Sequence, residues 1–270
     1  MEYNQTFLSL SEEAAFTSEI LKSGVTKLGK ANYAQRGLYF EAFTNISLGI
    51  ERLGKLCVLL DYYIHNNMTF PNEDYIRKIG HDLSELYNKS HELIKRNNIQ
   101  LRFDLPNTTI HKDIMKILTN FAKGDRYANL NALVNSKHQT DPILEWSQKV
   151  DDTLFDLRVS KKKKEDIKLF SEFIENAIGS MVMVRHFGED RQSIDSVESG
   201  SYRTGKWEAT AKYRQLYTAH IIRYWADLLS ILADRARELN SKEWDIPYLN
   251  EFFVIFRCPD SYLLTRKTYT

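Results

Sequence analysis

Apolar residues recur in alternating steps of four and three between Tyr39 and Ile64. This spacing follows the 3.6-residue period of an α-helix, so one helix face collects the whole stripe, whereas a strand would divide it between two faces. At about 1.5 Å per residue the predicted helix is roughly 40 Å long, which suits the central member of a bundle. We expect the stripe to be buried; it consists of Tyr39, Phe43, Ile46, Ile50, Leu53, Cys57, Leu60 and Ile64.

Helical periodicity also marks the segments on either side of this stretch. Residues 8–28 predict a shorter helix with a mixed apolar face. Pro71 stops the long helix, because proline lacks the amide hydrogen that a helix interior needs. A second helix is expected from Asn72, with four apolar side chains facing inward: Ile76, Ile79, Leu83 and Leu86.

The middle of the chain predicts two further helices. One runs through Phe121 and is capped by the polar residues 107–109. Residues 124–130 break the period and predict an ordered connector. Asp141-Pro142 is typical of a helix start, because aspartate caps the first turn and proline fits its first position. This helix is expected to continue to about Leu157.

The second half predicts two more helices and a short tail. An amphipathic helix begins near Ile167 and is expected to end near Gly188, after which residues 188–205 are polar and predicted to be flexible. The last long helix spans residues 207–239. The apolar run at residues 252–256 is too short for a helix prediction and indicates a small strand or a tail packed on the bundle. Together these elements predict an all-α fold: an antiparallel helical bundle, an appended long helical hairpin and a short C-terminal extended tail.

Charge and cysteine usage narrow the class of protein. The 270 residues carry 37 basic and 36 acidic side chains, so the net charge of +1 gives no overall attraction to nucleic acid. Cys57 and Cys258 occupy unrelated contexts, which is typical of free thiols in a reducing compartment. No basic leader precedes an apolar run, and no stretch approaches about eighteen apolar residues. We therefore expect a cytoplasmic protein that does not insert in a membrane.

Several catalytic and metal-binding signatures are missing from the sequence. It has no phosphate-binding loop, no dinucleotide-binding glycine pattern and no His-Glu-x-x-His motif. It also has no paired cysteines of the kind that hold a structural zinc. The adjacent carboxylates at Glu12-Glu13 and Asp151-Asp152 would point about 100° apart on a helix, so neither pair forms a two-metal site alone. We expect no metal and no cofactor, and chemistry that uses a side-chain base and a cation.

Two short motifs lie on the long helix and on the helix after it. They are Gly49-Ile50-Glu51-Arg52-Leu53-Gly54-Lys55-Leu56 and Gly80-His81-Asp82-Leu83-Ser84-Glu85-Leu86, and Arg126-Tyr127 follows some forty residues later. In these motifs the chain resembles the HEPN superfamily, small α-helical domains of prokaryotic toxins, phage-defence proteins and partners of minimal nucleotidyltransferases. The resemblance covers residues 33–133. It implies a HEPN-like bundle over residues 1–158, with residues 159–270 as a helical hairpin and tail packed on it in one compact unit.

The resemblance also implies a catalytic pair. Active HEPN ribonucleases carry an arginine followed four to six residues later by a histidine on a late helix, and Arg214 and His220 match that spacing. A histidine can deprotonate the ribose 2′-hydroxyl or protonate the leaving 5′-oxygen, because its pKa lies near neutrality. The arginine would hold the phosphate and stabilise charge on its oxygens. One histidine does not easily serve both roles, so a homodimer that brings two such helices together is expected.

The segment around this pair is basic and aromatic. Cations suit phosphates and aromatic rings suit bases, so the segment predicts single-stranded RNA binding through Lys206, Lys212, Tyr217 and Arg223. The alternative is that the aromatic rings pack on neighbouring helices while the cations coat the outside of the bundle. An arginine and a histidine that converge in a cleft would favour catalysis, whereas a pair that points apart, or is buried separately, would favour a binding function.

The second motif supplies a further group of polar candidates. Arg77 lies one helical turn before His81, and both are expected to share a polar pocket with Arg126, while Asp82 braces the helix start. The alternative is a histidine whose hydrogen bonds fix the helical hairpin. The remaining histidines have no polar neighbours in sequence that suggest a role: His65, His91, His111, His138 and His186.

Two functions therefore remain open at the level of sequence. The first is a metal-independent RNA-cleaving effector of toxin or phage-defence type, acting as a homodimer through Arg214 and His220. The second is a non-catalytic HEPN-like binding module, an antitoxin, sensor or scaffold for a protein or nucleotide partner. The resemblance also implies an antitoxin or a nucleotidyltransferase as a partner.

Overall fold

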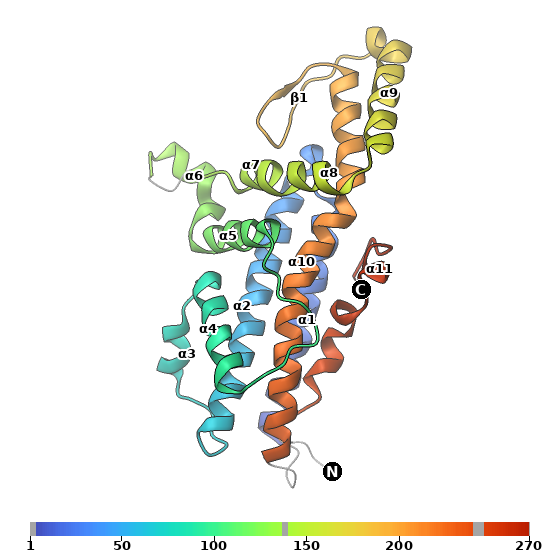
Figure 1. Cartoon of the computed structure of the whole chain (residues 1–270). Helices are drawn as coiled ribbons and strands as arrows, with labels where there is room; N and C mark the ends of the chain where they lie inside the picture. Colours follow the sequence, from blue (N-terminus) through green and yellow to red (C-terminus); the bar gives the residue numbers. More distant parts are fainter. Residues whose placement is uncertain (1–3, 137–139, 240–245, 270) are drawn as a thin grey trace.

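The computed structural model describes residues 4–136, 140–239 and 246–269, and this part of the chain is almost entirely helical. Within these residues the chain has only two strands, β1 (His186–Phe187) and β2 (Ser193–Ile194). Each strand is two residues long, and they pair in antiparallel orientation. Three long helices pack against one another through the molecule (Figure 1): α1 (Gln5–Lys30), α2 (Gly37–His65) and α10 (Val197–Leu239). The prediction of an all-α bundle is confirmed.

Helix α2 buries the apolar stripe that its sequence predicts. Seven of the eight side chains are at most 1% exposed, and Ile64 is half-buried against the same core. Neighbouring helices approach α2 closely because glycine leaves room for them. At Gly54 a Cβ atom would lie 2.3 Å from Leu86 Cδ2 of α4 (Leu83–Arg96). The motif around Gly54 therefore has a packing role in this fold.

The single helix expected after Asn72 is two helices, α3 (Glu73–Ile79) and α4. Gly80 breaks the chain direction, because its backbone φ of 67° lies in the left-handed region that glycine adopts readily. Asp82 then starts α4 by accepting from the amides of Ser84 (2.9 Å) and Glu85 (3.2 Å). The expected continuity is wrong, although Ile79, Leu83 and Leu86 are buried as predicted.

The middle of the chain wraps one side of α2 and α10. A 3-10 turn, η1 (Tyr33–Gln35), precedes α2. After α4 the chain forms α5 (Thr109–Lys123), η2 (Asp125–Tyr127), α6 (Ala128–Leu133), α7 (Pro142–Trp146), the π-helical turn η3 (Ser147–Asp151) and α8 (Asp152–Arg158). The predicted start at Asp141 is confirmed, because its Oδ1 accepts from the amides of Ile143 and Leu144.

Helix α9 (Lys161–Ile178), followed by the turn η4 (Gly179–Met181), packs along the first part of α10, and the two project beyond the bundle (Figure 1). Helix α9 ends ten residues before the expected Gly188. The predicted flexible segment 188–205 is instead the β1–β2 hairpin and the beginning of α10. Arg203 fixes the hairpin through an ion pair with Asp190 (2.8 Å), and Ile194 is fully buried beneath it.

The C-terminal apolar run forms a 3-10 helix, η5 (Leu249–Arg257), followed by α11 (Asp260–Leu263). Phe253 and Phe256 are fully buried against α1 and α10, so the run is a tail packed on the bundle. One hydrophobic core includes side chains from α1, α2, α10 and η5, and thus from both sides of the boundary proposed at residue 158. In the part of the chain that the structure describes, no helix is both long and apolar enough to cross a membrane.

Candidate functional site

Arg214 lies in the core of the bundle. Its side chain is 0% exposed, and its guanidinium donates to the Tyr39 hydroxyl (2.9 Å), Asp151 Oδ2 (3.0 Å) and the Ala31 carbonyl (2.5 Å). The π-helical turn η3 ends at Asp151, whose Oδ1 also accepts from Trp146 Nε1 at 3.1 Å. This arrangement joins α2, η3 and α10 through a buried ion pair, so Arg214 has a structural role in the observed fold.

The structure does not bring Arg214 and His220 together in a cleft. Helix α10 is continuous between them, and six residues on an ideal helix place two side chains about 120° apart. His220 therefore lies on a different face, where its side chain is 22% exposed. Arg214 has no solvent-exposed donor for a phosphate in this arrangement. A phosphate clamp for His220 must come from other arginines.

His220 lines a groove of about 970 Å³ between α10, the start of α5 and the segment 99–108. That segment leaves α4, passes across α10 and returns to α5 (Figure 1). The amide of Arg102 donates to the buried Asp227 carboxylate of α10 (2.6 Å), which holds the segment in place. The groove is therefore built on helices from both the first and the second half of the chain.

Four side chains in the groove form a continuous hydrogen-bonded series, which we call the relay. Thr108 Oγ1 lies 2.8 Å from His111 Nδ1, and His111 Nε2 lies 3.2 Å from His220 Nδ1. His220 Nε2 lies 3.0 Å from Asp260 Oδ2 at the start of α11. The Tyr217 ring packs on both imidazoles, with ring centroids 4.9 Å from His111 and 5.7 Å from His220.

The chemistry of Asp260 determines where each proton of the relay sits. An ionised carboxylate only accepts, so His220 must donate through Nε2–H and, as a neutral ring, accept at Nδ1. His111 then donates through Nε2–H and accepts at Nδ1 from the Thr108 hydroxyl. Thr108 is the N-cap of α5, yet its side chain makes no capping hydrogen bond, so its hydroxyl is free to point at His111. The basic nitrogen at the outer end of the relay is therefore His111 Nδ1.

The surroundings of the relay keep its two histidines neutral and its carboxylate ionised. Burial and the neighbouring His220 lower the pKa of His111 to about 4. Burial also lowers the pKa of His220, and the Asp260 carboxylate offsets only part of that effect. Burial opposes the ionisation of Asp260, but His220 and Arg223 outweigh it and hold the pKa of this carboxyl below its usual range. Both imidazoles are therefore neutral at pH 7, and the carboxylate of Asp260 is the group that would stabilise a proton taken up by His220.

Arginines surround the relay in two different roles. Arg223 is nearly buried: it donates to the carbonyls of Phe256 (2.9 Å) and Cys258 (2.7 Å) and pairs with Asp260 Oδ1 (2.8 Å). It therefore positions Asp260 and the tail. Arg102 and Arg158 are exposed; Arg102 lines the groove, and Arg158 Nη1 lies 3.5 Å from the Tyr217 hydroxyl. These two guanidiniums are the ones that solvent, and so a phosphate, can reach.

The other residues expected to bind RNA lie at separate places along α10. Tyr217 lines the groove, as described. Lys206 pairs with Asp152 (2.6 Å) in a different hollow, and Lys212 lies over the Tyr213 ring at 5.0 Å beside α9. The expected basic-aromatic segment is therefore not one continuous surface. Its aromatic members pack between helices, as the alternative from sequence supposed, with Tyr217 as the member that faces the groove.

The polar cluster expected from the second motif does not assemble. Arg77 is 70% exposed and pairs with Glu73 and Asp74, while His81 contacts Glu51 at 2.9 Å. Asp82 caps α4 and pairs with Lys123, and Arg126 lies over the Tyr127 ring at 5.2 Å. Glu51 also accepts from Lys55 at 2.7 Å, so the two motifs are linked by hydrogen bonds between α2 and the start of α4. His81 therefore has the geometry expected of a residue that fixes the hairpin of α2 and the helices after it.

His111 is the functional candidate that the sequence did not reveal. It stands 109 residues from His220 in the chain, so no local spacing relates the two. The only local signal is Thr108 three residues earlier, at a helix start, which places a hydroxyl beside the imidazole. Asp260 was equally hidden, because it lies on a short helix after the apolar tail.

Neither a cluster of metal-ligating side chains nor a comparison with known proteins assigns a function to this groove. Among the described residues no group of three or more His, Cys, Asp or Glu side chains is placed to hold a metal ion. No protein-family model, no curated protein and no solved structure matches the chain. The geometry of the relay and the resemblance of the sequence motifs to the HEPN superfamily are the features of this chain that bear on its function.

Proposed function

We propose that this protein is a metal-independent RNA-cleaving effector of toxin or phage-defence type, and that the relay carries out the proton transfer. The supporting observation is the series Thr108–His111–His220–Asp260, which opens into a groove of about 970 Å³. The HEPN resemblance supports RNA as the substrate class. This assignment keeps His220 in the reaction and replaces Arg214 with groups that line the same groove.

The relay accepts a proton at its outer end. A ribose 2′-hydroxyl that displaces the Thr108 hydroxyl donates to His111 Nδ1 as its oxygen attacks the adjacent phosphorus. His111 Nε2–H then passes its proton to His220 Nδ1, so the positive charge rests on His220 beside the Asp260 carboxylate. Because Asp260 stabilises that imidazolium, the base is stronger than a lone imidazole with the low pKa of His111.

The phosphate and the leaving group use other side chains of the groove. Arg102 and Arg158 are exposed cations within or beside it and would stabilise the charge that develops on the phosphoryl oxygens. The Tyr217 hydroxyl lies 3.5 Å from Arg158 Nη1 at the groove, and we assign it to protonate the leaving 5′-oxygen. The products are a 2′,3′-cyclic phosphate and a free 5′-hydroxyl, because the nucleophile belongs to the substrate.

Partners follow from the same proposal. Both histidines of the relay come from one chain, so a homodimer is compatible with the mechanism but no longer required to complete the site. An antitoxin or nucleotidyltransferase partner remains a proposal that rests on the HEPN resemblance alone. Either would be expected to cover the groove if it silences cleavage.

The experiment that tests this function compares cleavage of a short single-stranded RNA by matched variants. We expect His220→Ala and His111→Ala each to reduce cleavage about a hundredfold or more, because each interrupts the relay. His81→Ala is the matched control, since this histidine is 75% exposed on the side chain and pairs with Glu51 outside the groove. Cleavage should persist in EDTA. Equal loss of activity in His81→Ala, or no cleavage by the parent protein, would contradict the proposal.

A binding function is the second candidate, and two observations favour it. The first is that Arg214 and His220 do not converge in a cleft, the arrangement expected from sequence for a binding function. The second concerns the histidines themselves. All four imidazole nitrogens of the relay already have hydrogen-bond partners within the protein. The relay would then be a structural network that links α5, α10 and α11. On this account the groove binds RNA or a protein partner without cleaving it. Two results for His111→Ala would favour this structural role. The variant would bind intact RNA with the affinity of the parent, and its thermal stability would be much lower.

A further inference from the structure

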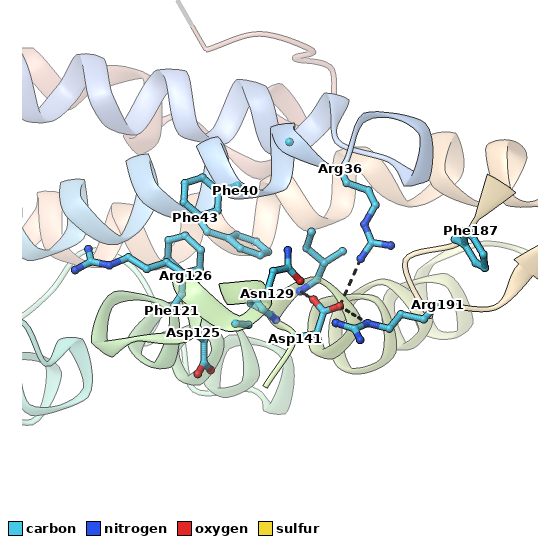
Figure 2. Close-up of a pocket in the computed structure, with 14 residues that line it drawn as sticks. Arg36, Phe40, Phe43, Phe121, Asp125, Arg126, Asn129, Asp141, Phe187 and Arg191 are labelled. Atoms are coloured by element: carbon cyan, nitrogen blue, oxygen red, sulfur yellow. Dashed lines mark hydrogen bonds and ion pairs between the residues drawn. The ribbon is translucent and has the colours of Figure 1, made fainter. Parts of the chain in front are cut away.

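A second hollow lies on the opposite end of α5 from the relay. It has a volume of about 600 Å³ and is bounded by the start of α2, the end of α5, η2, α6, the start of α7 and the β1–β2 hairpin. Figure 2 shows that arginines occupy its centre and phenylalanines its two sides. About ten residues of α5 separate this hollow from His111, which corresponds to roughly 15 Å. The two hollows are therefore distinct sites.

Two guanidiniums converge on a single carboxylate oxygen in this hollow. Arg191 Nε lies 2.9 Å and Arg36 Nη2 lies 3.4 Å from Asp141 Oδ2 (Figure 2). The other oxygen of Asp141 is occupied by the amides that start α7. One carboxylate balances one of the two guanidiniums, and Arg126 adds a further cation at the rim. The second carboxylate of the lining, Asp125, lies apart from the Arg36–Arg191 pair (Figure 2).

Both arginines are held in position by the backbone. Arg36 Nη1 donates to the Gly188 carbonyl of the hairpin at 3.1 Å. Arg191 has a backbone φ of 61°, a left-handed conformation that is strained for a non-glycine residue. The tight turn from Gly188 to Arg191 holds this conformation, because the Arg191 amide donates to the Gly188 carbonyl at 3.0 Å. Strain of this kind persists only where the surrounding structure holds it, so the hairpin fixes the Arg191 side chain at the hollow.

Exposed aromatic rings flank the arginine pair. Phe187 on the hairpin is 64% exposed, and Phe40 on α2 is 47% exposed. Phe40 is supported from below by Phe121, with ring centroids 5.3 Å apart. Exposed phenylalanine rings beside a positive centre are suited to a planar ring that carries an anionic group. An aliphatic acid would leave the rings in water, and a metal cation would be repelled.

We propose that this hollow binds a nucleoside phosphate, with the phosphate on Arg36 and Arg191 and the base against Phe187 or Phe40. Guanidinium forks match phosphate oxygens in geometry and charge, and aromatic faces stack on any base. The hollow has the volume of an ordinary small-ligand site. The ligand is either a free mononucleotide or the phosphorylated end of an RNA, since both present the same chemistry.

The test measures binding by calorimetry with five probes: adenosine 5′-monophosphate, adenosine, inorganic phosphate, and a short RNA with and without a 5′-phosphate. We expect the monophosphate to bind at least about tenfold more tightly than adenosine or phosphate alone. If the phosphorylated RNA binds and the free monophosphate does not, the ligand is an RNA end. Equal affinity for the monophosphate and for phosphate alone would overturn the role of the rings, and with it the proposal.

Matched variants show whether this hollow is the site. Arg191→Gln and Phe187→Ala are expected to weaken monophosphate binding about tenfold or more, and both side chains are exposed enough to be replaced without unfolding. Arg77→Gln, an exposed arginine on α3, is the control and should bind like the parent. His220→Ala should also bind like the parent, so failure of the RNA-cleavage proposal would leave this one standing. Unchanged affinity in Arg191→Gln would contradict the site.

Discussion

At the scale of single residues, the chemistry of the groove depends on the direction of three hydrogen bonds. Asp260 can only accept, and this fixes the tautomers of His220 and His111 in turn. The relay then has one basic nitrogen at its outer end, His111 Nδ1, covered by the Thr108 hydroxyl. Arg223 holds Asp260 from the other side. The groove therefore offers a substrate hydroxyl a single defined place to give up its proton.

Replacing Thr108 tests whether its hydroxyl only occupies that place. In the proposed reaction the 2′-hydroxyl of RNA displaces the Thr108 hydroxyl, so Thr108→Ala should cleave RNA within about threefold of the parent rate. The measurement is single-turnover cleavage at saturating protein. A loss of a hundredfold or more would show that Thr108 itself takes part in the chemistry, and the substrate hydroxyl would lose its assigned position.

The lowered pKa of His111 predicts how stability depends on pH. Because the folded-state pKa of about 4 lies below the unfolded value near 6.5, the unfolded chain binds a proton more readily between these limits. The contribution of neutral His111 to stability is therefore complete above about pH 6.5 and is lost as the pH falls toward 4. We expect the free energy of unfolding to drop by about 1–2 kcal/mol between pH 7 and pH 5, after allowance for solvent screening.

Urea unfolding at the two pH values measures this drop, and His111→Asn supplies the comparison. The variant cannot titrate in this range, so its own change between pH 7 and pH 5 should be smaller than that of the parent. An identical change in both proteins would show that His111 does not have its pKa lowered in the folded state.

Residue types and spacing predicted only part of the candidate site. His220 and Tyr217 lie in the groove, and their place on the last long helix was readable from the sequence. Arg214 is a motif match by spacing, but the 120° rotation over six helical residues sends it into the core. His111 and Asp260 reach the groove through tertiary packing of α5 and α11 on α10, and no periodicity in a single segment reports such a contact.

At the scale of elements, the apolar stripe of α2 supplies a buried face in the middle of the bundle, where α1, α4, α5 and α10 pack on this helix. Leu53 stands in the middle of the stripe and is 0% exposed. We expect Leu53→Ala to lower the free energy of unfolding by roughly 2–5 kcal/mol, from the lost apolar contact and the cavity left behind. Chemical denaturation of the purified variant measures it. A variant as stable as the parent would mean that the core around α2 does not depend on this stripe.

Helices with a sustained period were predictable, and the breaks between them were less so. The stripe in α2 and the Asp141-Pro142 start required only period and capping rules. The break at Gly80 was missed because inward-facing residues continue in register across it, while φ of 67° is a property of the backbone. Residues 188–205 looked like a flexible linker because they are polar, yet ion pairs such as Asp190–Arg203 order them.

At the scale of the whole molecule, α10 connects the projecting α9–α10 pair, the relay and the bundle core (Figure 1). Both histidines of the relay belong to one chain, so a single copy carries every group in the proposed reaction. We expect the specific activity to be independent of protein concentration over a range in which light scattering shows the mass of the protein to change. A specific activity that falls as the protein is diluted would instead support a site shared between two copies.

The pH dependence of RNA cleavage shows whether the relay is the base in the proposed reaction. The substrate is a short DNA strand with a single ribonucleotide, so that one 2′-hydroxyl is available and the cyclic phosphate product can be identified. If the relay is the base, the rate should stay high as the pH falls through 6.5 and decline only at lower pH, because burial lowers the pKa of both histidines of the relay. A rate that already falls through pH 6.5, as for a solvent-exposed imidazole, or a substrate that remains intact from pH 4 to pH 8, would contradict the account.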